Sequence, residues 1–310
     1  MPLIRPEYHP LDRIPTRAVL AAVVYGGGAC GGEVLTVSAP IPQLGPALAE
    51  VWRAEGAVTR EQRGDIEIAR TGDVLFGVVR RGGGPTAEIT AAVYDSIVGA
   101  VRSAGYPALW RIWNNVGGIN ELEEGMERYK RFSAGRHEAL TRHGYARERF
   151  PAASAVGMTE PGLLVYFLAG RQEGKQVENP RQVSAYDYPP RYGPRSPSFS
   201  RATVVGDELI FVAGTASVVG HESRHAGSAA AQLEETIENL DATLAAATAG
   251  RKASAGDLTV VKIFVRPGTD PAPVEDRLRA VFPASMLLEA DICRRELLLE
   301  IEGVAVLPKR

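Results

Sequence analysis

Two acidic side chains interrupt an apolar stretch near the C-terminus, which reads FPASMLLEADICRRELLLEIEGVAV over residues 282–306. Glu300 and Glu302 are two residues apart, so in a strand both side chains would lie on the same face. Burial removes the hydration of a carboxylate and raises its pKa towards neutrality. A carboxyl group of this kind can donate a proton, so the pair is a candidate for general acid catalysis, and the spacing alone does not choose between them.

The same stretch contains Cys293, which has two interpretations. Its thiol could assist a proton transfer, or it could be a small buried apolar side chain, which is the usual role of a free cysteine. The chain has one other cysteine, Cys30. Two cysteines give no disulfide framework, which fits a reducing cytoplasm.

Two short motifs match signatures whose surroundings do not support them. The residues GGGACG at 26–31 follow an apolar strand pattern, but EVLTVSAPIP comes next and alternates like a strand, so we expect a hairpin turn and no dinucleotide site. The residues HESRH at 221–225 would need a helix to present both histidines to zinc, and their flanks resemble strand and turn. A zinc hydrolase is therefore a minor alternative, and we expect no metal site.

The composition is that of a soluble globular protein. The chain has 310 residues, of which 45% are hydrophobic and 23% charged, and the net charge is −2. Nothing in this balance favours binding to nucleic acid or to a membrane surface. The N-terminal sequence has no signal-peptide pattern and no apolar run is long enough to span a membrane, so we expect a cytoplasmic protein.

The elements that would position these residues occur twice along the chain in the order ββαβαβ. In the first half we expect a strand, a glycine turn and a strand at 18–42, a hairpin at 65–81 turning at Gly72, a helix ending at Gly105, a strand at 107–116, a helix at 121–144 and a strand at 162–170. In the second half we expect a hairpin at 199–219 turning at Gly206, a helix at 228–250, a strand at 257–268, a short helix at 274–282 and a strand at 295–307.

Local matches between the halves support an internal duplication: TGDVLF resembles VGDELI, and LWRIWN resembles VVKIFV. We therefore predict an α+β fold with a first repeat at 1–172, a connector rich in proline and tyrosine at 173–197 and a second repeat at 198–310.

Residues 198–308 resemble a subunit of the reactive intermediate deaminase (YjgF-like) family. The resemblance lies in SRATVVGDELIFVAGTAS, QLEETIENLDATLAAA, DLTVVKIFV and FPAS followed by EIEGVAV. It implies a sheet backed by two helices, as in the trimeric chorismate mutases of that shape, with sites at subunit interfaces. The family's arginine after FPA is replaced here by Ser285, which argues against simple imine hydrolysis, whereas its glutamate on the last strand matches Glu300.

The whole chain resembles the chorismatases. This resemblance lies in RIWNNVGGINELEEGMERYKRFSAGRHEAL, YDYPPRYGPRSPSFSRA, GTASVVGHESRH and CRRELLLEIEG. It implies release of the enolpyruvyl group of chorismate as pyruvate without a cofactor, with the active site between or beside the repeats. In one subtype the ring becomes 3-hydroxybenzoate, and Cys293 and Gly206 match that subtype. In the other the product is a cyclohexadiene diol acid.

The resemblance also assigns roles to further residues. Glu300 would be the general acid, and the substrate would be bound by Tyr129, Arg136, Tyr188 and Arg201. Tyr129 and Arg136 are seven residues apart on a predicted helix and would share a face. The alternative for the arginines is an ordinary surface position. An imine deaminase or a non-enzymatic ligand-binding protein remain alternative functions, and the oligomeric state, monomer or trimer, stays open.

Overall fold

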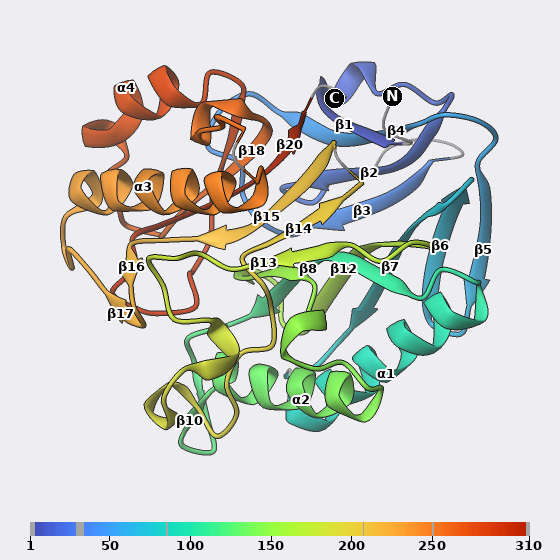
Figure 1. Cartoon of the computed structure of the whole chain (residues 1–310), viewed down its shortest axis with the longest axis horizontal. Coiled ribbons are helices and arrows are strands. Elements are labelled where there is room, and N and C mark those ends of the chain that lie inside the picture. The colour runs from blue at the N-terminus through green and yellow to red at the C-terminus, as the bar shows by residue number, and fades with distance from the viewer. Residues whose placement is uncertain (1–3, 29–33, 85, 207, 250, 308–310) are drawn as a thin grey trace.

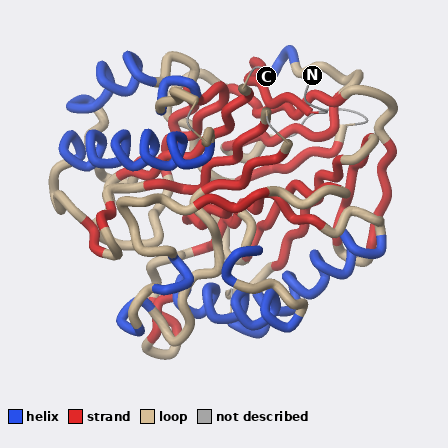
Figure 2. Tube along the Cα trace, viewed as in Figure 1, coloured by secondary structure: helices blue, strands red, loops and turns tan. Residues whose placement is uncertain are grey.

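The computed structural model describes residues 4–28, 34–84, 86–206, 208–249 and 251–307. In these residues three sheets form the centre of the molecule, and helices cover it on two outer sides (Figure 1). Figure 2 shows the same arrangement, with the strands in the middle and the longer helices outside. No described helix is long and apolar enough to cross a membrane. The α+β fold predicted from the sequence is confirmed.

The first large sheet contains residues from Thr59 to Gly170. Its strands have the spatial order β11-β8-β12-β7-β6-β5. They are β5 (Thr59–Arg63), β6 (Ile66–Thr71), β7 (Val74–Arg81), β8 (Ala108–Gly117), β11 (Ala152–Met158) and β12 (Leu163–Gly170). Two helices, α1 (Ala87–Ser103) and α2 (Arg128–Arg142), cover its outer face. The Thr86 hydroxyl caps α1 by accepting a hydrogen bond from the Ile89 N–H.

The second large sheet has the order β13-β14-β15-β20-β18-β19. Its strands are β13 (Lys175–Val177), β14 (Ala202–Val205), β15 (Leu209–Thr215), β18 (Leu258–Val265), β19 (Ser285–Glu289) and β20 (Leu299–Val306). The helices α3 (Ala229–Ala247) and α4 (Ala272–Val281) lie on its outer side.

The two sheets have the same topology. In each, the third strand leads into the first helix, the fourth and fifth strands are parallel neighbours, and the sixth strand pairs between the third and the fourth. The structure therefore confirms two repeats of a helix-backed sheet. Each repeat has the order βββαβαββ, so the sequence pattern missed the short first strand and the fifth strand, which are β5 and β11 in the first repeat.

A third sheet comes from the N-terminal residues, which the sequence did not separate from the first repeat. It contains β1 (Ile4–Pro10), β4 (Leu48–Ala54), β2 (Val19–Tyr25) and β3 (Leu35–Ala39) in that order. Strands β2 and β3 are parallel, so the expected hairpin between them is wrong. Residues 29–33, which include part of the glycine motif, lie outside the described residues.

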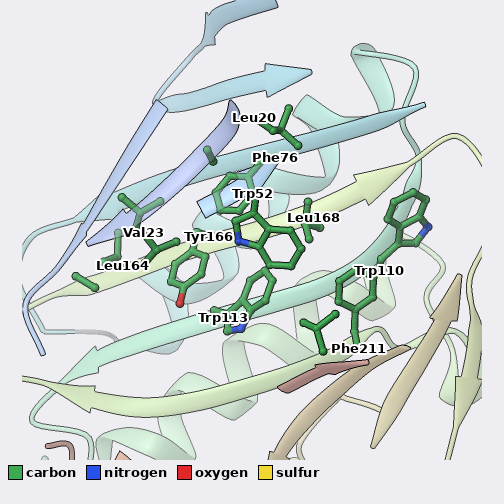
Figure 3. Packing of buried hydrophobic residues seen from close by; sticks show 14 of the residues in the cluster. Leu20, Val23, Trp52, Phe76, Trp110, Trp113, Leu164, Tyr166, Leu168 and Phe211 are labelled. Atoms are coloured by element: carbon green, nitrogen blue, oxygen red, sulfur yellow. The ribbon is translucent and has the colours of Figure 1, made fainter. Parts of the chain in front are cut away.

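The inner faces of the three sheets share one apolar core. Trp52 of the N-terminal sheet lies 5.8 Å from Trp113 of the first large sheet and 6.2 Å from Phe211 of the second, measured between ring centroids (Figure 3). With helices on one face and this core on the other, strands such as β8 and β12 are buried along their whole length.

Two boundaries near the site differ from the sequence prediction. Helix α2 begins at Arg128, because the residues before it form the small hairpin of β9 (Leu122–Glu123) and β10 (Met126–Glu127). Strand β20 begins at Leu299, because residues 294–298 form a turn. Glu127 of the hairpin and residues 294–297 of the turn line the pocket described next.

Candidate active site

A cavity of about 320 Å³ lies between the two repeats. Its wall comes from the first turns of α2, from β11, from the connector, from β15 and from the segment that ends in β20. Six predicted residues line it: Tyr129, Arg136, Tyr188, Arg201, Cys293 and Glu300. The structure thus brings together side chains that are up to 171 positions apart in the sequence, from 129 to 300.

Arg136 is a buried cation that forms no ion pair with any described residue. Only 1% of the residue is exposed. Its guanidinium group lies over the rings of Phe132 and Phe199, and its Nε and Nη2 atoms have no hydrogen-bond acceptor among the described residues. Burying an unpaired charge is costly, so this position is suited to an anionic ligand.

Arg201 supplies a second cation from the other repeat, directly before β14. Its Nη2 atom donates a hydrogen bond to Tyr188 Oη at 2.7 Å, and its Nε atom has no acceptor in the described part of the chain. Tyr188 ends a short helical turn of the connector, Ala185–Asp187. The connector is thus an ordered wall of the pocket.

Tyr129 and Cys293 face the pocket from opposite repeats. Burial, and then the charge of Glu300, raise the pKa of Cys293 to about 12. Burial also raises the pKa of Tyr129 above its ordinary value. Near neutral pH both groups keep their protons, so each can donate a hydrogen bond, and Cys293 is no thiolate nucleophile.

Glu300 lies on β20 with 4% of its surface exposed. Burial and the neighbouring Glu302 raise its pKa to about 8, against the opposing effects of Arg111 and Arg201. Its carboxyl group lies over Gly214, where an added Cβ would be 2.0 Å from Glu300 Oε1. Gly214 lies where the pairing register of β15 with β20 shifts, between Val212 and Thr215. Such an irregularity changes the direction of a strand, here next to the site.

Glu302 is held quite differently from Glu300. It does not line the pocket. Its carboxylate forms ion pairs with Arg111 Nη2 at 2.6 Å and with Lys262 Nζ at 2.8 Å. Burial alone would raise the pKa of Glu302, but the two cations lower it below its ordinary value. Two acids whose environments separate their pKa values in this way are suited to different roles.

Gly206 is the predicted site residue that the structure leaves apart. It is at the turn between β14 and β15 with φ of 59°, and it does not line the pocket. Apart from its chain neighbours, no described residue lies within 4 Å of where its Cβ would be. The HESRH residues form β17 (Glu222–Ser223) and its adjoining turns, not a helix. His221 lies beside Tyr192 and Arg191 at the pocket's edge.

Sequence reasoning missed several residues of the site. Gly214 has the signal of a glycine inside a buried strand, which often marks a close approach by another group. Arg111 had a signal too, a single cation within the apolar run LWRIWN. Ser154 and Arg294 gave no signal that distinguishes them from other serines and arginines.

Taken together, the pocket offers two buried cations and neutral hydrogen-bond donors around a carboxyl group that holds a proton near pH 7. It can bind a small dianion and protonate it.

Comparisons with known proteins agree with this geometry. Residues 50–169 match the family model described as chorismatase FkbO/Hyg5-like, N-terminal. The chain is 40% identical to a chorismatase from Streptomyces rapamycinicus over 83% of this chain and 82% of the relative. It is 37% identical to a 3-hydroxybenzoate synthase from Streptomyces hygroscopicus over 89% of this chain and 86% of that one. A chorismatase crystal structure matches 97% of this chain and 98% of its own length, with a TM-score of 0.87 and 32% identity.

Proposed function

The chain belongs to the chorismatase family, and from this premise we propose that it cleaves chorismate to pyruvate and 3-hydroxybenzoate. Chorismate is a small dianion with an enol ether, which is the kind of ligand that the pocket's cations and its acid can bind and protonate. The relative named 3-hydroxybenzoate synthase supports the aromatic product.

In this proposal Arg136 and Arg201 bind the two substrate carboxylates. Both guanidinium groups are buried and have nitrogen atoms without acceptors among the described residues. Tyr188 orients Arg201 through its hydroxyl group, and Tyr129 faces the same space from α2. A substrate carboxylate at each arginine would supply acceptors for the guanidinium nitrogen atoms that have none.

Glu300 protonates the terminal methylene carbon of the enol ether. The observation that carries the proposal is that this carboxyl group, with its pKa raised to about 8, is at the pocket wall that Arg201 also lines. Protonation turns the side chain into a leaving group. The ring hydroxyl then displaces it: the ring C–O bond breaks, the side chain departs as pyruvate, an epoxide forms, and the hydroxyl proton returns to the Glu300 carboxylate. The epoxide opens by taking up a proton on its oxygen and becomes aromatic by losing a ring proton.

The product choice depends on whether water takes part. Pyruvic acid and 3-hydroxybenzoic acid together contain the atoms of chorismic acid, whereas the diol acid requires one added water. Cys293 faces the site as a neutral thiol and can donate a proton during ring opening. At the pocket, Gly214 leaves room for the carboxyl group of Glu300.

The test is incubation of the protein with chorismate, followed by chromatographic identification of the products. We expect one 3-hydroxybenzoate for each pyruvate. In Glu300→Gln we expect pyruvate release to fall by about a hundred- to ten-thousand-fold, because the amide cannot donate the proton. A full rate in that variant, or ammonia release from imines without chorismate turnover, contradicts the proposal.

Both walls of the pocket come from one chain, since α2 and β11 belong to the first repeat and β15 and β20 to the second. We therefore propose that a monomer is sufficient for turnover. Specific activity that stays constant on dilution would agree, and a loss of activity that follows dissociation of an oligomer would not.

A further inference from the structure

A buried ion cluster lies directly behind Glu300. Lys262 of β18 is paired across the sheet with Glu302 of β20, and its Nζ atom lies 2.8 Å from Glu302 Oε1 and 2.7 Å from Glu50 Oε2. Arg111 of β8 contacts the other oxygen of Glu302 at 2.6 Å. The four side chains are at most 3% exposed. They come from all three sheets and meet in the shared core.

The cluster is balanced in charge without Glu300, since it contains two acids and two cations. Burial would lower the pKa of Lys262, but Glu302 and Glu50 raise it well above its ordinary value, so Lys262 keeps its charge. Its ammonium group also lies over the rings of Trp113 and Tyr166. Among the described residues no cation forms an ion pair with Glu300, so burial disfavours a negative charge there.

The groups that face Glu300 come from several elements. The charge on Glu302 disfavours its ionisation, and the charges on Arg111 and Arg201 favour it. Cys293 is a further titratable neighbour. Ser154 joins the two acids structurally, because its hydroxyl donates to Glu302 and accepts from the N–H of Gly214, on which the Glu300 carboxyl group lies.

We propose that Glu302 is a positioning residue for the reaction: its permanent charge, held by Lys262 and Arg111, keeps Glu300 protonated until the substrate is bound. This inference rests on the proposed function. Glu302 touches no part of the pocket, so it acts only through Glu300 and through the Ser154 link.

The test is the pH dependence of kcat/KM for pyruvate release, which reports groups of the free enzyme. For the wild type we expect activity to fall above about pH 8, where Glu300 loses its proton. This fall is the alkaline limb of the pH profile. Removing a negative neighbour lowers the pKa of an acid, so Glu302→Gln should move the alkaline limb by about one pH unit or more to lower pH. Such a shift reduces activity roughly fivefold at about pH 8 and hardly at all at about pH 6.

Arg111→Gln provides the opposite test, because removing a cation raises the pKa of Glu300 and should move the limb to higher pH. Glu50→Gln is the matched control. It disrupts the same cluster at Lys262, but Glu50 is not among the charges that shift Glu300, so its limb should stay close to that of the wild type. Glu302→Asp keeps the charge and should restore most of the wild-type profile.

A purely structural role for the cluster would lower the rate equally at all pH values, without opposite shifts in the two variants. If Glu302→Gln does not fold, as judged by circular dichroism, the test is the direction in which Arg111→Gln moves the alkaline limb, which should be to higher pH. An unmoved limb in the folded variants overturns this inference while chorismate turnover by the wild type still stands. A wild type that releases no pyruvate at any pH overturns the proposed function instead.

Discussion

At the scale of single residues, the site depends on two neighbouring glutamates that the fold treats differently. Glu300 lies in the pocket wall with a raised pKa, and Glu302 lies behind it with a lowered one. The difference between their pKa values does not come from the strand, because β20 places both side chains on the same face. It comes from Lys262 and Arg111, which reach Glu302 from other strands.

The buried arginines give a prediction about substrate binding. Arg136→Ala and Arg201→Ala should each weaken chorismate binding by about 2–5 kcal/mol, because a desolvated carboxylate would lose its partner. The measurement is the Michaelis constant together with a direct titration of an unreactive chorismate analogue. Arg142→Ala on the same helix is the control, since Arg142 is half exposed and pairs with Asp95 and Glu138. An unchanged affinity in Arg136→Ala would contradict its role as an anion site.

Cys293 gives a prediction about the product. If its neutral thiol directs ring opening, Cys293→Ala should still release pyruvate, because protonation by Glu300 comes first. The ring product should shift from 3-hydroxybenzoate towards the diol acid or a stalled intermediate. The measurement is the ratio of aromatic to non-aromatic product for each pyruvate. If Cys293 only packs, alanine lowers stability by about 1 kcal/mol and leaves this ratio unchanged.

At the scale of elements, the irregularity in β15 fixes the position of the general acid. It allows Gly214 to lie under the Glu300 carboxyl group while its N–H donates to Ser154 at 2.8 Å. Cys293 lies in the irregular segment before β20, and Tyr129 lies in the first turn of α2, directly after the hairpin, so both side chains reach the pocket.

Gly214→Ala should therefore displace the Glu300 carboxyl group, because the new Cβ would lie 2.0 Å from Oε1. A misplacement of about 1 Å can cost about a hundredfold in rate, so we expect a loss of that order in kcat with little change in global stability.

Gly206→Ala is the comparison. It places alanine at φ of 59° in open space, so it should cost about 1 kcal/mol of stability and leave kcat unchanged. A changed ratio of aromatic to non-aromatic product in Gly206→Ala would support the role in subtype control that the sequence assigned to Gly206.

At the scale of the whole molecule, three sheets join at one interior that is apolar around Trp52 and ionic around Lys262. Tyr8 of the N-terminal sheet donates to the Val261 carbonyl on β18 at 2.6 Å, and Glu50 reaches Lys262 from the same sheet. The N-terminal sheet is thus attached to the second repeat close to the groups behind the active site.

Placing a protonated glutamate in this interior should make stability depend on pH. The pKa of Glu300 is raised to about 8 in the folded state, and it returns to about 4.3 on unfolding. Its contribution to stability is therefore complete below about pH 4 and is lost as the pH rises to about 8. Glu300→Gln does not titrate, so its free energy of unfolding relative to the wild type should increase by up to a few kcal/mol between about pH 5 and pH 8. Urea unfolding of both proteins at the two pH values measures this, and a constant difference would mean that Glu300 is ionised throughout.

The sequence by itself determined the type of most elements and the duplication, because these depend on local periodicity and on turn residues. The hairpin at Gly72 and the helix ending before Gly105 were found for that reason. The family resemblance identified the six predicted residues that line the pocket, Glu300 among them.

Only the tertiary structure decided which side chains meet across elements. It separated Glu300 from Glu302, it placed Gly214 and not Gly206 at the acid, and it showed the N-terminal residues as a sheet of their own. It also showed that Arg111 and Lys262, which occupy matching positions in LWRIWN and VVKIFV, both contact one carboxylate. The physical reason is that pKa values and steric fit depend on atoms a few ångströms away in space, and these atoms come from strands that the sequence places far apart.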